Sequence, residues 1–251
     1  QIVTHTLSTC LCGTFFFADT YTFNIFIEPY ILQYNRYYKN EMVYRNAKPN
    51  HAHNFLTRLG EIKDVTIITQ NIDGLHKDAK SKKVIEVHGT TKRNYCINCH
   101  KEFDLDYIMN SKDKVPLCDK CGGVIKPDVV LFEEPLDEFA IEASIEALEQ
   151  ADLMIVIGSS LVVYPVAAFP SYFRGNHFVI INKDVTPMDR YAEITIRDNI
   201  IDVTKELEKE LLASMSNRKM DCRDDAITAY ALCRVYKSMG DKDNYICWLV
   251  Q

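Results

Sequence analysis

Residues 153–160 read LMIVIGSS, and this stretch decides the fold class. Five apolar residues in a row, without polar alternation, predict a strand that is buried on both faces. Gly158, Ser159 and Ser160 follow at the carboxyl end of this strand, and apolar residues at helical spacing come next. The order of strand, small polar loop and helix is typical of a parallel sheet covered by helices.

The same alternation extends outward from this stretch. Apolar runs predict further strands, and apolar residues at helical spacing predict helices. The expected strands are 65–68, 84–87 and 178–181, and the expected helices are 30–44, 49–60, 137–150, 163–173 and 200–212. We therefore predict an α/β fold: a Rossmann-like parallel sheet with helices on both faces.

The composition is that of an ordinary globular protein. Of 251 residues, 47% are hydrophobic and 25% are charged, and the net charge is −6. The acidic balance gives no support to direct binding of nucleic acid. No apolar run approaches the roughly 20 residues of a membrane span, and Gln1 to His5 carry no cationic stretch typical of a secretory signal. We expect neither a membrane partner nor export.

Four cysteines form two pairs, Cys96-x2-Cys99 and Cys118-x2-Cys121, with eighteen residues between the pairs. This spacing predicts a small zinc-ribbon module with four thiolate ligands, and a closed site of this kind is structural rather than catalytic. Four unconnected buried cysteines and an iron–sulfur cluster are the alternatives, and His100 is a competing ligand. Paired cysteines without an export signal match a reducing cytoplasm.

Polar side chains gather where the predicted strands end. Residues 69–76 read TQNIDGLH, residues 86–89 read EVHG, the Gly158–Ser160 loop ends a third strand and Asn182 a fourth. In a parallel sheet the carboxyl ends of the strands meet at one edge, where such folds bind ligands. Backbone N–H groups beside small hydroxyl residues suit phosphate, and a histidine suits proton transfer. A polar turn, a structural histidine and simple helix capping remain the alternative interpretations.

Taken together, these blocks resemble the sirtuins, the silent-information-regulator NAD-dependent protein deacylases, and the bacterial type in particular. The blocks at 69–76 and 86–89, the cysteine pairs, KPDVVLF at 126–132, GSSLVVYP at 158–165 and Asn182 come in the family's order and spacing. The resemblance covers roughly residues 47–212. It implies an NAD-dependent protein-lysine deacetylase or deacylase, which transfers the acyl group to ADP-ribose and releases nicotinamide.

The resemblance also implies roles for individual residues. His88 would be the base that activates a ribose hydroxyl, with Asn71 and Asp73 holding the ribose and the carboxamide. NAD would be bound by Gln70, Asn71, Ile72, Asp73, Gly158, Ser159, Ser160 and Asn182. An acyl-lysine protein or peptide would lie between Val129, Val130 and Phe132 on one side and Val162, Val163 and Tyr164 on the other. The implied cofactors are NAD and a structural zinc ion.

The domain organisation follows from the same reading. We expect a partial helical module at 1–46, a Rossmann-like NAD-binding domain at 47–90 and 132–212, and the zinc-ribbon module at 91–131. Residues 213–251 form a C-terminal extension to which the sequence assigns no role.

The sequence departs from the family pattern near its start. Sirtuins carry a Gly-Ala-Gly-x-Ser loop for the pyrophosphate, whereas Gly13 is the only glycine before Gly60 here. The sequence therefore starts late relative to the family or belongs to a non-catalytic relative. Two smaller departures are Lys80, where the family usually has glycine, and Glu133, where glycine is common.

Four functions remain in competition. The first is the working deacylase, and the second is a catalytically impaired fragment or binding protein for ADP-ribose or an acyl-lysine peptide. The third, a zinc-ribbon nucleic-acid binder, leaves the strand-end blocks unexplained. The fourth, mono-ADP-ribosyl transfer to protein, uses the same residues as the first.

Overall fold

The computed structural model describes residues 38–111, 115–131 and 134–216. Most of the helical module expected at 1–46 and most of the extension expected at 213–251 lie outside these ranges, and so do Phe132 and Glu133. None of the helices in the described ranges has the length and apolar character needed to cross a membrane.

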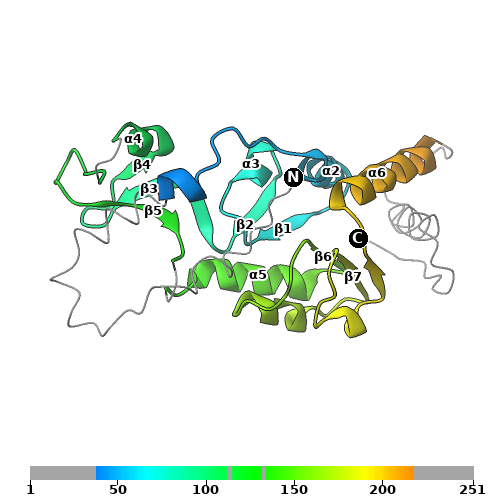
Figure 1. Ribbon diagram of the computed structural model, residues 1–251. Coiled ribbons are helices and arrows are strands. Elements are labelled where there is room, and N and C mark those ends of the chain that lie inside the picture. The colour runs from blue at the N-terminus through cyan, green and yellow to red at the C-terminus, as the bar shows by residue number, and fades with distance from the viewer. Residues whose placement is uncertain (1–37, 112–114, 132–133, 217–251) are drawn as a thin grey trace.

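The fold has a larger lobe, which contains the parallel strands, and a smaller lobe, which contains the antiparallel strands. The larger lobe has two parallel sheets (Figure 1). One pairs β1 (Thr66–Thr69) with β2 (Lys83–Glu86), and the other has the order β6 (Leu153–Ile157), β7 (His177–Ile181) and β8 (Ile194–Ile196). The four predicted strands are confirmed to within one residue at each end. The sequence did not predict β8, whose three residues are too few to show a pattern.

Helices cover both faces of the second sheet, as the α/β prediction requires. Val179 and Ile181 of β7 lie in one core with α2 (His51–Ile62) and α6 (Ile200–Ser216). Phe178 and Ile180 point to the opposite face. The second core contains them together with residues of α5 (Glu138–Gln150) and of the 3-10 helix η2 (Val166–Tyr172). Successive side chains of one strand therefore fill two cores, which is why this strand is apolar throughout.

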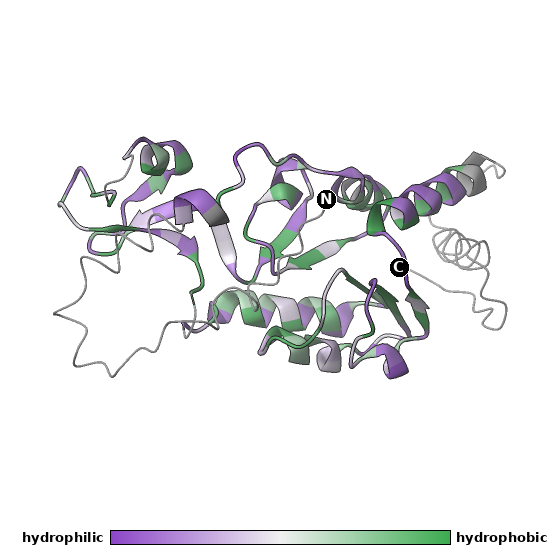
Figure 2. Ribbon diagram, viewed as in Figure 1, coloured by the Kyte–Doolittle hydropathy of each residue, from purple (hydrophilic) through white to green (hydrophobic). Residues whose placement is uncertain are grey.

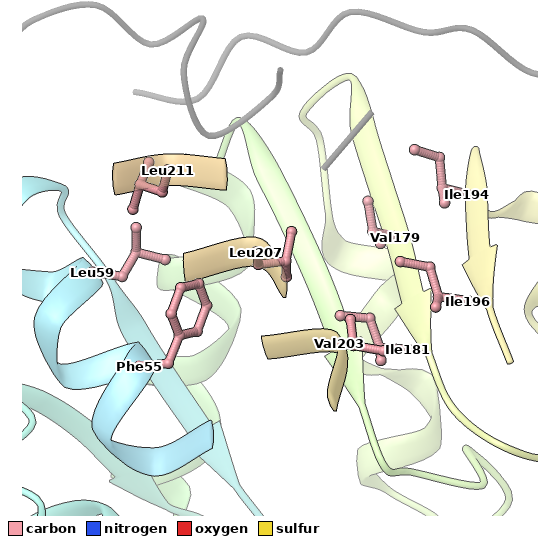
Figure 3. Packing of buried hydrophobic residues seen from close by; sticks show 9 residues of the cluster. All are labelled: Phe55, Leu59, Val179, Ile181, Ile194, Ile196, Val203, Leu207 and Leu211. Carbon is pink, nitrogen blue, oxygen red and sulfur yellow. The ribbon is translucent and has the colours of Figure 1, made fainter. Parts of the chain in front are cut away.

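The first core shows why α6 forms where it does. Val203, Leu207 and Leu211 recur every four residues, so they share one helix face, and this face contacts Phe55 and Leu59 of α2 (Figure 3). Figure 2 shows the result, with hydrophobic and hydrophilic stripes along α6. Truncating a buried leucine such as Leu207 to alanine costs about 2–5 kcal/mol in comparable cores.

The helix expected at 163–173 is shorter than predicted and is not an α-helix. The structure has the 3-10 helix η2 at Val166–Tyr172, with Pro170 inside it. Proline has no N–H and its ring crowds the preceding turn, so a regular α-helix cannot pass through this position. Another 3-10 turn, η3 (Asp189–Tyr191), connects β7 to β8.

The smaller lobe interrupts the parallel fold as an antiparallel unit. Its sheet has the order β4 (Glu102–Asp104), β3 (Gly89–Cys96) and β5 (Ile125–Val129). The short helix α4 (Leu105–Asn110) packs on this sheet, and the π-helical turn η1 (Tyr38–Met42) lies against it. Tyr38 is 1% exposed, and its hydroxyl donates to the main-chain oxygen of Thr91 at 2.8 Å.

Candidate active site and metal site

One cavity of about 1740 Å³ runs along β1 and β6, and the loops at the carboxyl ends of these two strands line part of it. Its walls bring together nine of the residues singled out in the sequence. These are Gln70, Asn71, His88, Val130, Gly158, Ser159, Ser160, Val163 and Tyr164. Residues that follow β1, β2 and β6 and residues of the two segments expected to bind the peptide thus share one cavity.

Five further candidates do not line this cavity. Val129 is buried in the core of the smaller lobe, and Ile72 packs against the same core. Asp73 lies just before α3 (Leu75–Asp78), and its carboxylate accepts the N–H of Leu75 at 2.9 Å. Asn182 lies at the end of β7, and Val162 is 55% exposed.

His88 is held in a defined tautomer. Its Nδ1 lies 3.2 Å from the main-chain oxygen of Gln70, and a carbonyl oxygen only accepts hydrogen bonds. The proton of the neutral ring therefore sits on Nδ1, which leaves Nε2 with a free lone pair. Burial lowers the pKa of His88 from its usual 6.5, and the bond to the Gln70 oxygen opposes part of this shift. The ring is neutral near pH 7 and can accept a proton there.

The backbone on either side of His88 is fixed by β5. The oxygen of His88 accepts the N–H of Val130 at 3.0 Å, and Gly89 pairs with Val129. Gly89 has φ +74, and a Cβ there would lie 2.0 Å from the oxygen of Asp128. Only glycine fits this position, so the close approach of β5 to His88 requires it.

The loop after β1 is organised by its own polar side chains. The N–H of Asn71 donates to the hydroxyl of Thr69 at 3.1 Å, and Gly74 begins α3 with φ 70. Gln70 reaches across the cavity, where its Nε2 lies 3.5 Å from the hydroxyl of Ser159. Gln70 thus faces both His88, through its carbonyl, and the loop after β6, through its amide.

The loop after β6 turns through a strained residue. The Ser159 hydroxyl accepts the N–H of Leu161 at 3.3 Å, and Leu161 is a buried non-glycine residue with φ 52. Such a conformation costs about 1–2 kcal/mol in an L-residue, and strain of this kind concentrates at functional sites. The turn separates Ser159 and Ser160 from the exposed segment that contains Val162 and Tyr164, of which Tyr164 is 77% exposed.

A pair of largely buried histidines lies in the wall of the cavity, and the sequence analysis did not predict their contact. The rings of His53 and His76 have their centroids 4.6 Å apart, and both residues line the cavity wall. Burial first, and then the neighbouring His53, lower the pKa of His76 to about 4. The Nδ1 atom of His76 is buried without a hydrogen-bond partner in the described part of the chain. The two residues come from helices far apart in sequence, so only the fold brings them together.

The four cysteines come together as the spacing predicts. All four Sγ atoms lie within 4.8 Å of one another, with Cys96 and Cys121 at 3.4 Å and Cys99 and Cys118 at 3.6 Å. A tetrahedral zinc ion with bonds of about 2.3 Å requires sulfur atoms about 3.8 Å apart, so this set fits zinc. No histidine belongs to the cluster in the described residues.

The two cysteine pairs have the same local geometry. The N–H of His100 donates to the oxygen of Cys96 at 2.9 Å, and the N–H of Gly122 donates to the oxygen of Cys118 at 2.8 Å. Both residues have positive φ, 55 for His100 and 71 for Gly122. His100 therefore has the position of a turn residue, and its ring stacks on Tyr95 rather than on the sulfur cluster.

Comparison with known proteins agrees with this geometry. The model of the Sir2 family matches residues 21–165. An NAD-dependent protein deacetylase of Clostridium tetani is 52% identical over 176 residues, which cover 70% of this chain and 71% of the relative. The deacetylase of the same description from Clostridium perfringens is 50% identical over 177 residues, covering 70% and 72%.

Solved structures agree as well. A Sir2 structure with a p53 peptide and NAD+ is 38% identical, with a TM-score of 0.67, and covers 77% of this chain and 85% of that chain. A Sir2 structure bound to an acetylated peptide is also 38% identical, with a TM-score of 0.67 over 74% of this chain and 80% of that chain. The residues that match the family model contain most of the cavity lining, His88 and the cysteine cluster, and the chain belongs to the Sir2 family.

Proposed function

We propose that this protein is an NAD-dependent protein-lysine deacetylase with His88 as its general base. The observation that carries the proposal is the fixed, neutral imidazole of His88 in a cavity at the carboxyl ends of the strands. The Gln70 carbonyl oxygen holds the proton on Nδ1, so the unprotonated Nε2 can accept a proton from the substrate. Relatives of the same family, about half identical to this chain, are NAD-dependent protein deacetylases.

The residues around the cavity suit NAD. The large cavity presents amide groups from Gln70 and Asn71 and hydroxyl groups from Ser159 and Ser160, a donor set that fits ribose hydroxyls, a carboxamide and phosphate oxygens. When bound, NAD supplies an electrophilic ribose carbon and the nicotinamide leaving group. In our proposal the ADP-ribose part lies against the loop after β6, and the nicotinamide end lies against the loop after β1.

The substrate peptide is proposed to add as an extended strand between the segment that begins at Val129 and Val130, at the end of β5, and the segment 162–164. Main-chain pairing of this type reads the backbone more than the sequence. The N–H of Val130 donates to the main-chain oxygen of His88, so the segment that would flank the peptide is held beside the residue proposed as the base. This link supports delivery of the acyl-lysine next to His88. Because an amide oxygen is a weak nucleophile, such positioning must supply much of the acceleration.

Zinc is proposed to hold the smaller lobe together without taking part in the reaction. All four ligand positions are filled by thiols, which leaves no open position for a substrate. The requirement for four reduced cysteines is also why we propose the cytoplasm as the compartment.

The decisive experiment is a mass-spectrometric assay of the purified chain with NAD and an acetyl-lysine peptide. The expected products are nicotinamide and O-acetyl-ADP-ribose in equal amounts, and His88→Ala is expected to abolish both while still binding ADP-ribose. Full activity of His88→Ala would refute the assignment of the base.

Binding of ADP-ribose or an acetyl-lysine peptide without any product would favour a binding protein instead of an enzyme. Transfer of ADP-ribose to a protein acceptor in the same assay would favour the mono-ADP-ribosyl transfer that uses the same residues.

A further inference from the structure

The loop that follows β7 is held by hydrogen bonds from Arg197, a residue just after the neighbouring strand β8. Asn182 begins this loop, and Arg197 lies directly after β8. The Nη1 atom of Arg197 donates to the main-chain oxygens of Asn182 at 3.1 Å and of Asp184 at 2.9 Å. Its Nη2 atom donates to the carboxylate of Asp189. One guanidinium therefore holds the beginning and the end of the loop 182–189 at once.

Asp189 closes the same loop from inside. Its other carboxylate oxygen accepts the N–H of Thr186 at 3.2 Å and the Thr186 hydroxyl at 2.7 Å. Thr186 is 4% exposed, so this part of the loop is buried against the fold. We call the contacts of Arg197 with Asn182, Asp184 and Asp189 the clasp. Its hydrogen bonds are charge-assisted, and the planar guanidinium fixes both the direction and the length of each bond.

The clasp is connected to the loop after β6 through the backbone. The N–H of Asn182 donates to the oxygen of Ile196 at 3.0 Å, and the N–H of Gly158 donates to the oxygen of Ile181 at 3.0 Å. The carboxyl ends of β6, β7 and β8 are therefore linked in one row, from the loop with Ser159 to Arg197. A polar residue at the end of the strand next to a phosphate loop is well placed to bond an adenosine ribose.

We infer that Arg197 is a positioning residue for the adenosine half of the nucleotide, acting through the main-chain oxygens of Asn182 and Asp184. This inference rests on the proposed function, because it requires a nucleotide at the ends of β6 and β7. Arg197 itself makes no contact with the reacting atoms. Its effect is confined to the half of NAD that lies farthest from His88.

A positioning role for Arg197 predicts weaker binding of NAD with unchanged binding of the peptide. A general structural role predicts that both are weakened. Loss of the clasp leaves the Asn182 loop held only by its own contacts, which include the N–H of Asn182 on the Ile196 oxygen and its side chain on the Asp184 oxygen, so affinity for the ADP-ribose part falls. The histidine base, the peptide segments and the residues proposed for the nicotinamide end lie in the segments at or after the ends of β1, β2 and β5 and in the segment 162–164. In the described part of the chain none of them bonds to the clasp, so we expect the variant to leave them unchanged. The KM for NAD should therefore rise without a change in kcat or in the KM for the peptide.

The test compares Arg197→Gln with the matched control Arg190→Gln in the full chain. Arg190 lies in the same connection between β7 and β8, is exposed, and places its guanidinium over the Tyr191 ring at 4.6 Å. We expect Arg197→Gln to raise the KM for NAD and the dissociation constant of ADP-ribose about tenfold, the effect of losing one charge-assisted hydrogen bond. Arg190→Gln is expected to leave both unchanged.

Two further variants keep the test decisive. Arg197→Lys retains the charge but cannot reach two carbonyls and a carboxylate together, so it should restore only part of the affinity. Asp189→Asn leaves the two main-chain bonds of Arg197 in place and should be intermediate, which gives a result even where Arg197→Gln folds poorly. An equal loss in the affinities for ADP-ribose and for the acetyl-lysine peptide would indicate a general structural role and overturn the inference.

Calorimetric titration of ADP-ribose distinguishes this inference from the proposed function. When the unaltered chain binds ADP-ribose and Arg197→Gln binds it equally well, the inference fails and the proposed function stands. When the unaltered chain, folded and loaded with zinc, binds no ADP-ribose, the nucleotide site fails and the inference fails with it.

Discussion

The Nδ1 atom of His88 lies 3.2 Å from the main-chain oxygen of Gln70, so the residue that presents its amide to Ser159 also fixes the tautomer of the proposed base. A base held through a backbone carbonyl cannot lose its partner by side-chain substitution. The orientation of His88 therefore depends on the path of the loop after β1 and not on the chemistry of any one side chain within it.

The first prediction concerns the pH dependence of turnover. The base works in its neutral form, so activity rises with pH through the pKa of His88. Because burial lowers this pKa below 6.5, the midpoint of the acid limb is expected below 6.5. A profile of kcat/KM between about pH 5 and about pH 8, with His88→Ala as the baseline, measures it. A midpoint at or above the ordinary value would contradict the assignment.

The second prediction concerns acid stability and the histidine pair. Above the ordinary pKa of 6.5 His76 is neutral in both the folded and the unfolded chain. As pH falls from there toward about 4, the unfolded chain binds a proton that the folded chain does not, so stability decreases. Urea unfolding at several pH values should show this loss, and His76→Gln should reduce its slope. The same slope in both proteins would mean that His76 titrates normally.

The third prediction concerns the metal. The purified chain is expected to contain about one zinc ion, and Cys118→Ala should lose both the ion and the folded smaller lobe. His100→Ala is the matched control and should keep the zinc, because His100 serves as a turn residue. Elemental analysis together with near-ultraviolet circular dichroism measures both effects. Zinc retained by Cys118→Ala would show that the cysteine cluster is not the site.

The fourth prediction concerns Lys80, where the family usually has glycine. Lys80 has φ 72, a left-handed conformation that costs an L-residue about 1–2 kcal/mol. Lys80→Gly removes this strain but adds backbone freedom to the unfolded chain, so a net stabilisation of about 0.5–1 kcal/mol is expected. Lys82→Gly, at an exposed neighbouring position without positive φ, should destabilise instead. Equilibrium unfolding in urea compares the two, and a destabilised Lys80→Gly would speak against the strain.

Much of the fold could be predicted from local pattern. The runs that became β1, β2, β6 and β7 are apolar and short, and their ends were correct to within one residue. The cysteine cluster could also be predicted from the sequence, because two closely spaced cysteine pairs are typical of a metal site. The strand-end blocks predicted a shared site, since parallel strands present their carboxyl ends at one edge.

What the sequence could not supply was contact between distant segments. The pairing of His53 with His76 depends on how α2 packs near α3. The clasp of Arg197 depends on the parallel register of β7 and β8, and β8 itself is too short to leave a pattern. Asp73 was expected among the ligand-binding groups, and in the structure one of its carboxylate oxygens accepts the Leu75 N–H, a local contact that the sequence did not predict. Short-range capping competes with ligand binding for the same oxygens, and sequence alone does not decide between them.

The separation of the parallel strands into two sheets has a mechanical consequence. Within the described residues β1 bonds only to β2, and β6 bonds only to β7, with the cavity between them. Among the described residues, the two sheets are joined through the packing of α2 against α6 and of α5 against β2. Side-chain packing tolerates small sliding displacements that a hydrogen-bonded ladder resists. Within the described residues, the spacing of the loops after β1 and β6 is thus set by side-chain contacts such as that of Gln70 with Ser159, and not by a β-ladder between the two sheets.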